Sequence, residues 1–162
     1  MKLHTKNASR RWRTRTMMAV AAAIGSVVML IAAPGAAQAD GGQGRFSNME
    51  TYLCLDGNEV GNVYTSSCDG SNPWLTWEET STPLGAHQLR SLATNRCLDS
   101  NYDGVVYSNP CDRNNLHQNW RWNGEGGGHI RNAATNLCLD SNHARQVYTL
   151  PCQAGNRYQD WA

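Results

Sequence analysis

Short runs of apolar or aromatic residues, separated by polar turn residues, dominate the chain after residue 39. Clusters of Gly, Asn, Asp, Ser and Pro interrupt these runs about every ten residues, a pattern that predicts β-strands joined by turns. No window in this region has the i, i+3, i+4 spacing of an amphipathic helix. The pattern of apolar and polar positions therefore predicts an all-β fold.

The same pattern occurs three times. Each unit begins with Cys-Leu-Asp, at Cys54, Cys97 and Cys138, and a second cysteine follows 14 positions later. A tryptophan lies 9 positions after the second cysteine, and an apolar residue lies 8 positions before the first. One such unit cannot bury its own apolar face. We therefore expect three repeats, over about 43–82, 83–124 and 125–162, that share a core around a pseudo-threefold axis.

Four strands are expected in each repeat. In the first repeat they lie around Phe46 and over 53–56, 62–65 and 76–79, with equivalents in the other two. Trp74 and Trp122 fall outside the repeated pattern. The expected core contains Leu55, Leu98, Leu139, Val63, Val106, Val147, Phe46, Leu89, Ile130, Trp77, Trp120 and Trp161.

All six cysteines lie after residue 39, and an even number in a small domain indicates a disulfide framework. A zinc site is disfavoured, because there is no C-x-x-C pair and the histidines are scattered. Six cysteines allow fifteen pairings. The repeat symmetry selects Cys54–Cys68, Cys97–Cys111 and Cys138–Cys152.

Residues 1–39 have the pattern of an export signal. A basic segment ends at Arg15, residues 17–33 are almost entirely apolar, and Ala37-Gln38-Ala39 precedes Asp40 as a small-x-small cleavage pattern. A retained membrane anchor is the alternative. We expect a signal peptide over 1–39, a folded domain over 40–162, and a secreted protein.

From Asp40 onward, 8 arginines stand against all 13 acidic residues of the chain. A mildly acidic domain has no cationic surplus to exchange for counterions. Nucleic acids and membrane surfaces are therefore not expected as partners.

Together, the repeated C-L-D, the second cysteine 14 positions later and the closing Q-x-W resemble the ricin B-type lectin repeat. That family has a β-trefoil fold with one potential sugar site per repeat, and it often occurs in secreted bacterial proteins as a carbohydrate-binding module. The resemblance covers essentially the whole chain after residue 39. It implies a β-trefoil and a carbohydrate partner.

The resemblance also implies roles for individual residues. The aspartate of C-L-D accepts hydrogen bonds from sugar hydroxyls, the glutamine of Q-x-W orients it, and an asparagine shortly before the glutamine completes the site. Leu75 replaces the glutamine in the first repeat. The matching residues are Asp99, Asn115 and Gln118 in the second repeat, Asp140, Asn156 and Gln159 in the third, and Asp56, a weaker candidate, in the first.

One position departs from the family pattern. Sugar sites of the family usually carry an aromatic ring two positions before the second cysteine, where this chain has Ser66, Asn109 and Leu150. Tyr107 and Tyr148 lie two positions earlier, on the same face of a strand, and are the candidates to replace that ring.

A carbohydrate-binding module is the leading expectation. The alternative is a trefoil scaffold that binds protein, as an inhibitor or interaction factor, with degenerate sugar sites. No histidine has a fixed spacing to a nucleophile, so no enzyme is expected. Neither interpretation requires a cofactor or a metal.

Overall fold

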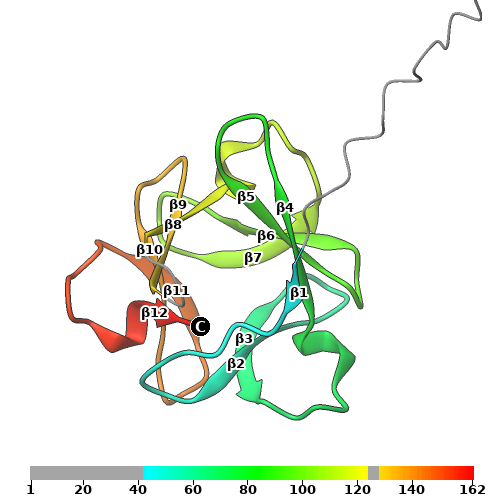
Figure 1. Cartoon of the computed structure of the whole chain (residues 1–162), viewed down its shortest axis with the longest axis vertical. Helices are drawn as coiled ribbons and strands as arrows, with labels where there is room; N and C mark the ends of the chain where they lie inside the picture. The colour runs from blue at the N-terminus through cyan, green and yellow to red at the C-terminus, as the bar shows by residue number, and fades with distance from the viewer. Residues whose placement is uncertain (1–41, 124–127) are drawn as a thin grey trace, which may run out of the picture. The chain divides into compact units, whose positions relative to one another are not determined.

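The computed structural model describes residues 42–123 and 128–162, which form twelve β-strands and three short 3₁₀ helices. In Figure 1 these elements form three lobes around a common centre. In chain order they are β1 (Gln43–Gly44), β2 (Leu53–Gly57), β3 (Val63–Ser67), η1 (Pro73–Leu75), β4 (Trp77–Ser81), β5 (His87–Ser91), β6 (Arg96–Ser100), β7 (Val106–Pro110), η2 (Leu116–Gln118), β8 (Trp120–Asn123), β9 (Gly128–Asn132), β10 (Cys138–Ser141), β11 (Val147–Leu150), η3 (Arg157–Gln159) and β12 (Asp160–Trp161). The expected all-β class is confirmed.

The strand expected around Phe46 is wrong, whereas β2, β3 and β4 lie within two residues of their predicted bounds. β1 ends at Gly44, which pairs with Trp77 of β4. The chain then leaves β4 and turns toward β2, so the Phe46 carbonyl accepts the Leu55 N–H at 2.9 Å. Phe46 still packs against the core, but from an irregular segment.

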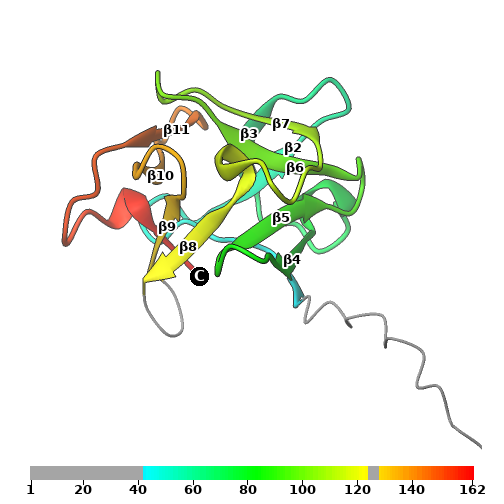
Figure 2. The same cartoon turned by 90° about the horizontal axis from the view of Figure 1, so that it is seen from above.

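Six strands pair in a closed ring, in the order β1, β4, β5, β8, β9 and β12. Reciprocal backbone bonds between Ser47 and Ala162, of 2.7 and 3.0 Å, close the ring next to β1. The hairpins β2–β3, β6–β7 and β10–β11 add the remaining strands. In Figure 2 β3, β7 and β11 lie toward the same end of this ring.

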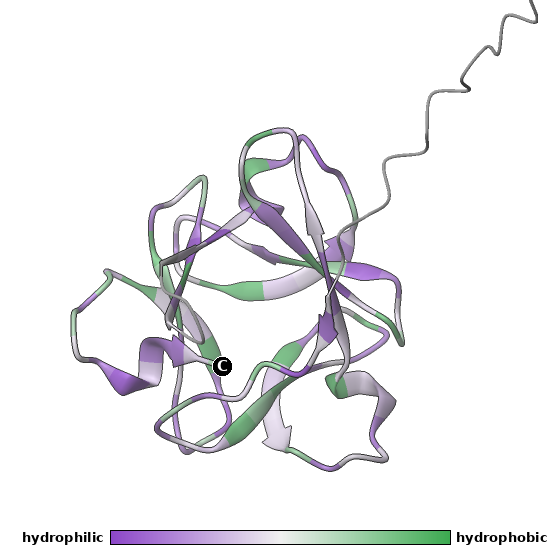
Figure 3. Cartoon of the chain, in the orientation of Figure 1, coloured by the Kyte–Doolittle hydropathy of each residue, from purple (hydrophilic) through white to green (hydrophobic). Residues whose placement is uncertain are grey.

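The core contains a leucine, a valine and a tryptophan from equivalent positions of every repeat. The buried cluster consists of all the expected leucines, valines and tryptophans together with Leu89 and Ile130, and Phe46 and Trp122 pack against it. Figure 3 shows hydrophobic segments recurring on the three hairpins. The three repeats therefore share one core, because no single repeat supplies more than about a third of it.

Each repeat-ending tryptophan is tied to the hairpin of its own repeat. Trp77, Trp120 and Trp161 are at most 2% exposed. Each indole N–H donates a 3.0 Å hydrogen bond to the carbonyl of the leucine that follows the first cysteine. The indole thus fills the core and fixes the hairpin to a strand of the ring in one contact.

A tight turn before each first cysteine explains why a threonine recurs there. The Thr51 hydroxyl accepts the Leu53 N–H at 3.3 Å, and the equivalent threonines do the same at 3.2 Å. The residue between them has a left-handed backbone, with φ between 57° and 60°. These residues are Tyr52, Asn95 and Asn136.

Three disulfides join Cys54 to Cys68, Cys97 to Cys111 and Cys138 to Cys152, as the repeat symmetry predicts. Each spans 14 positions within one repeat. A cross-link over a loop of this size stabilises a domain by about 3 kcal/mol in the chain-entropy model. Three such bonds indicate folding in an oxidising compartment.

The expected signal peptide over 1–39 and the expected first residue of the domain, Asp40, lie outside the described residues. Within 42–123 and 128–162, no helix is long and apolar enough to cross a membrane.

We predict that Trp120→Phe lowers the free energy of unfolding by about 2–4 kcal/mol. The change leaves the Leu98 carbonyl buried without its donor and removes part of a fully buried ring. Urea denaturation followed by circular dichroism, with the disulfides intact, measures the loss. Trp122→Phe is the matched control: Trp122 is partly buried and packs edge-on against Phe46, so we expect about 1 kcal/mol or less. Equal losses in the two variants would contradict the role given to the indole–carbonyl bond.

Candidate functional site

Each hairpin places a carboxylate directly across from a phenol. Residues opposite each other on antiparallel strands present their side chains on the same face. The three aspartates are at most 3% exposed, while the tyrosines are half-buried. The cross-strand pairs are Asp56–Tyr64, Asp99–Tyr107 and Asp140–Tyr148.

An asparagine brings the 3₁₀ helix of each repeat to its aspartate. The Asn156 side chain caps η3 by accepting the Tyr158 N–H at 3.2 Å, and its amide donates to Asp140 Oδ2 at 3.3 Å. Asn115 does the same toward Asp99, with distances of 3.0 and 3.5 Å. The structure therefore brings the predicted asparagines and aspartates together.

Asn72, which was not among the predicted site residues, has the same role in the first repeat. It caps η1 through the Trp74 N–H at 3.0 Å and donates to Asp56 Oδ2 at 3.3 Å. The signal was present in the sequence: all three asparagines lie four positions after the second cysteine of their repeat.

The predicted glutamines connect the loop after the second cysteine to the site. Gln118 donates to Asp99 Oδ2 at 3.1 Å and to the Pro110 carbonyl at 3.1 Å, and it accepts the Asp112 N–H at 2.8 Å. Gln159 makes the same two backbone contacts in the third repeat, at 3.1 and 2.9 Å. Both side chains are almost fully buried. Leu75, buried at this position in the first repeat, has no polar atom to do so.

The position two before the second cysteine differs among the repeats and changes how the aspartate is held. Ser66 donates its hydroxyl to Asp56, and Asn109 donates its amide to Asp99 at 3.3 Å. Leu150 has no polar side-chain atom and is 46% exposed. The third carboxylate therefore lacks a donor that the other two have.

The third repeat has an open depression of about 530 Å³ around its aspartate. Asp140 contributes to its floor, together with Tyr148 and Asn156. His143 and Tyr158 line the rim, with their ring centroids 5.8 Å apart and their planes at 86°. This combination of a carboxylate, an amide, a phenol and adjacent rings offers both hydrogen-bonding groups and apolar ring surface to a small ligand.

Burial shapes the ionisation of this site. It raises the pKa of the Asp140 carboxyl above its ordinary value, and surrounding donors, Gln159 and Tyr148 foremost, oppose the shift. Burial, and then the Asp140 carboxylate, raise the pKa of the Tyr148 hydroxyl. Tyr148 therefore keeps its proton at neutral pH and remains a donor.

Trp74 belongs to the repeated pattern, contrary to the sequence analysis. It is the middle residue of η1, as His117 is of η2 and Tyr158 is of η3. All three lie six positions after a second cysteine, so every repeat has a ring at this place. In the second repeat His117 packs edge-on against Tyr102, with centroids 5.1 Å apart. The expectation failed because the three rings are of different residue types.

Among the described residues, one group has metal-ligand chemistry. His129 lies within 4.8 Å of the sulfur atoms of Cys138 and Cys152. Those sulfurs form a disulfide and have no thiolate to offer a metal.

The comparisons with known proteins identify the domain. A family model of the Ricin-type beta-trefoil lectin domain matches residues 42–161. The chain belongs to this family. The designed threefold-symmetric protein ThreeFoil superposes with a TM-score of 0.63 at 18% identity, over 74% of this chain and 95% of that one. SeviL, solved bound to asialo-GM1 saccharide, superposes with a TM-score of 0.61 at 15% identity, over 74% of this chain and 94% of that one. A search of curated proteins finds no match.

The expected β-trefoil and the expected lectin family are thereby confirmed. At these identities the two structures support the fold of the lectin domain.

We predict that Leu150→Asn lowers the pKa of Asp140. An amide at position 150 would donate to the ionised carboxylate, as Asn109 does to Asp99. Titration of the side-chain carboxyl by NMR measures the change, and an unchanged midpoint would contradict it. Because the folded pKa of Asp140 is raised, its ionisation costs stability as the pH rises from the ordinary aspartate value through the folded value. The variant should reduce that loss.

Proposed function

We propose that this chain is a secreted carbohydrate-binding protein, exported by a signal peptide over 1–39 and folded over 40–162. The third repeat is its principal site and the second a weaker one. The observation that carries the proposal is the buried Asp140 carboxylate at the floor of an open depression, without a donor from position 150 and with two rings at the rim.

The chemistry of the third site suits two adjacent sugar hydroxyls. An ionised carboxylate accepts from both at once, and such charge-assisted bonds are stronger than neutral ones. Asn156 is held by η3 with its amide toward Asp140, and the Tyr148 hydroxyl is a further donor. Sugar hydroxyls would supply the partners that Leu150 does not.

Stacking on a ring supplies the rest of the affinity. The family usually places this ring two positions before the second cysteine, where Leu150 stands. Here Tyr158 and His143 line the same depression as Asp140 and offer a ring in its place. An aromatic contact of this kind is worth about 0.5–1.5 kcal/mol beyond the area it buries.

The second repeat has an aspartate, an asparagine and a tyrosine at the same positions, but its aspartate already accepts more hydrogen bonds from neighbouring side chains. Asp99 Oδ2 already accepts from Asn109, Asn115 and Gln118. Its Oδ1 accepts no hydrogen bond from the described residues but is buried, so a sugar hydroxyl reaches it only if the neighbouring side chains move. We assign this repeat a weaker site.

The first repeat is the poorest candidate. Asp56 Oδ2 accepts from Ser66 and Asn72, and Oδ1 accepts the Gly57 N–H at 2.7 Å. Both oxygens are therefore engaged within the repeat. With Leu75 in place of the glutamine as well, we propose that this site does not bind sugar.

A protein-binding trefoil is the alternative function. The absence of an aromatic ring at positions 66, 109 and 150 favours it, because the lack of a stacking surface would weaken sugar binding in all three repeats. The rings at 74, 117 and 158 favour the lectin function instead, since each belongs to the residue two positions after the asparagine that donates to the aspartate of its repeat.

We predict that the purified, oxidised protein binds members of a glycan array or an insoluble polysaccharide. Asp140→Asn should weaken this binding at least about tenfold, because it removes a charged acceptor. Asp99→Asn should cause a smaller loss, and Asp99→Asn combined with Asp140→Asn should abolish binding. Asp56→Asn is the matched control and should change the affinity less than about twofold. If no glycan binds, or if all three single variants lose affinity equally, the proposed function is wrong.

We predict further that Tyr158→Leu weakens glycan binding by about three- to tenfold, whereas Tyr158→Phe retains most of it. Leucine keeps an apolar side chain but loses the ring face, while phenylalanine keeps the face and loses only the hydroxyl. Isothermal titration calorimetry with the best glycan from the array measures both. Equal affinity of the leucine variant and the unaltered protein would mean that Tyr158 is not the platform.

A further inference from the structure

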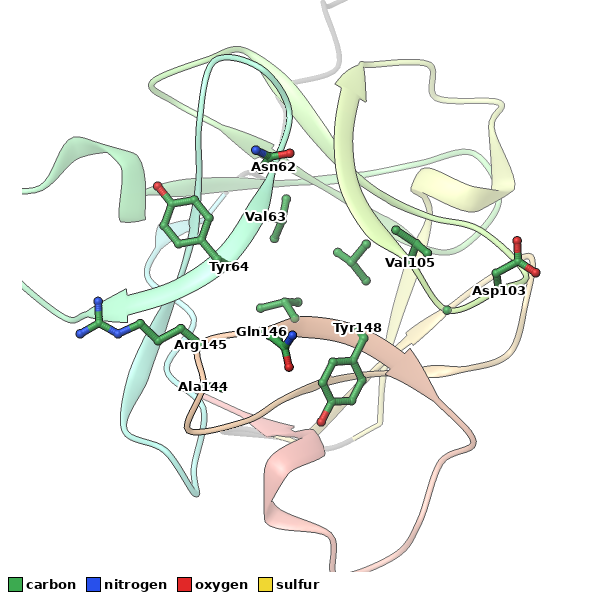
Figure 4. A pocket seen from close by; sticks show the side chains of 12 residues that line it. Asn62, Val63, Tyr64, Asp103, Val105, Ala144, Arg145, Gln146 and Tyr148 are labelled. Carbon is green, nitrogen blue, oxygen red and sulfur yellow. The ribbon is translucent and has the colours of Figure 1, made fainter.

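A second depression, of about 730 Å³, lies where β3, β7 and β11 meet around the pseudo-threefold axis. It differs from the individual repeat sites because residues of all three repeats line it. Figure 4 shows Asn62 and Tyr64 from the first repeat, Val105 from the second, and Arg145 and Tyr148 from the third.

The backbone around this depression is held by three hydrogen bonds between repeats. The carbonyls of Gly61, Gly104 and Arg145 accept strand N–H groups of a neighbouring repeat at 2.8, 2.9 and 3.0 Å. All three residues have a left-handed backbone, with φ of 94°, 81° and 66°. They lie seven positions after the first cysteine of their repeats.

Two of these positions require glycine. A Cβ at Gly61 would lie 2.7 Å from a carbonyl oxygen of the adjoining repeat, and one at Gly104 would lie 2.6 Å from another. The third repeat has Arg145 instead, which costs about 1–3 kcal/mol in this backbone conformation. A residue held at such a cost is a reason to look for a function.

Within the described part of the chain, the Arg145 side chain makes no hydrogen bond or ion pair that would offset that cost. The Arg145 side chain is exposed, and the ion pairs among the described residues involve His87, Arg90, His129 and Arg157 instead. In Figure 4 Arg145 lies beside Tyr64, while Asp103, an acidic residue of the lining, lies on the opposite side. The arginine is therefore free to bind an anion brought by a ligand.

The axial depression adjoins the depression around Asp140 in the third repeat. Tyr148 and Ala144 line both depressions. A chain of sugars that begins on Asp140 can thus pass over Tyr148 and Gln146 toward Arg145.

We propose that the third repeat binds acidic oligosaccharides. The hydroxyls of one sugar contact Asp140, and a carboxylate or sulfate on the next contacts the Arg145 guanidinium. A planar guanidinium binds either group through two parallel hydrogen bonds. The amide of Gln146 and the hydroxyl of Tyr64 supply further donors at this subsite. This inference rests on the proposed function, since it assumes that sugar binds at Asp140.

The test uses a glycan array in which every acidic chain is paired with its neutral parent. Sialylated and uronate-containing chains present a carboxylate, and sulfated chains beside their desulfated forms present a sulfate. We expect the unaltered protein to bind acidic members about tenfold more tightly than their neutral parents. The preference should decrease between about 50 and 500 mM salt, because the subsite is open to solvent.

Three variants locate the preference. Arg145→Gly, which restores the residue of the other two repeats, should reduce the ratio of acidic to neutral affinity to about one and leave the melting temperature unchanged or higher. Arg145→Asn tolerates the left-handed backbone and should behave in the same way. Arg121→Gln removes an equal charge on β8, away from the depression, and should leave the ratio unchanged.

Each outcome supports or overturns the proposal. Equal affinity of the unaltered protein for acidic and neutral members overturns it and leaves the proposed function intact. A preference that persists in Arg145→Gly also overturns it, because the cation would then lie elsewhere. If no glycan binds at all, the proposed function fails and this inference fails with it.

Discussion

The indole N–H of the repeat-ending tryptophan and the leucine carbonyl that accepts it hold each repeat of this trefoil together. The bond is 3.0 Å long in all three repeats and is buried in every one. It connects a strand of the ring to the hairpin that carries the aspartate. Because the hairpin is fixed in this way, the carboxylate has one position relative to the 3₁₀ helix that follows the second cysteine.

Because each hairpin is held in the same position, the three repeats keep the same backbone arrangement while the side chains at their sites differ. The aspartate, the capping asparagine and the disulfide recur in all three repeats. The repeats differ at two positions whose residues in the third repeat line the depressions. One is Ser66, Asn109 or Leu150, and the other is Gly61, Gly104 or Arg145. The third repeat departs from the others at both places, which is why the two proposals concern it.

The predictions that held are those that depend on spacing. The disulfides, the core and the β-trefoil follow from a register that repeats without drift, because identical spacing must place equivalent residues equivalently around the axis. The predictions that failed concern single residues. Phe46 does not lie in a strand, because the chain turns there from β4 toward β2. Trp74 was not recognised as part of the repeat, because the equivalent residues are histidine and tyrosine.

Spacing in one dimension is therefore enough to specify the fold and to indicate which residues form the sites. It cannot show which carboxylate is already saturated by its own neighbours, since that depends on distances across a hairpin, as for Ser66 and Asp56. It also cannot show that Arg145 faces a depression formed by three repeats, or that its backbone is left-handed. Those properties arise when segments far apart in the chain pack around one axis, and they exist only in the folded domain.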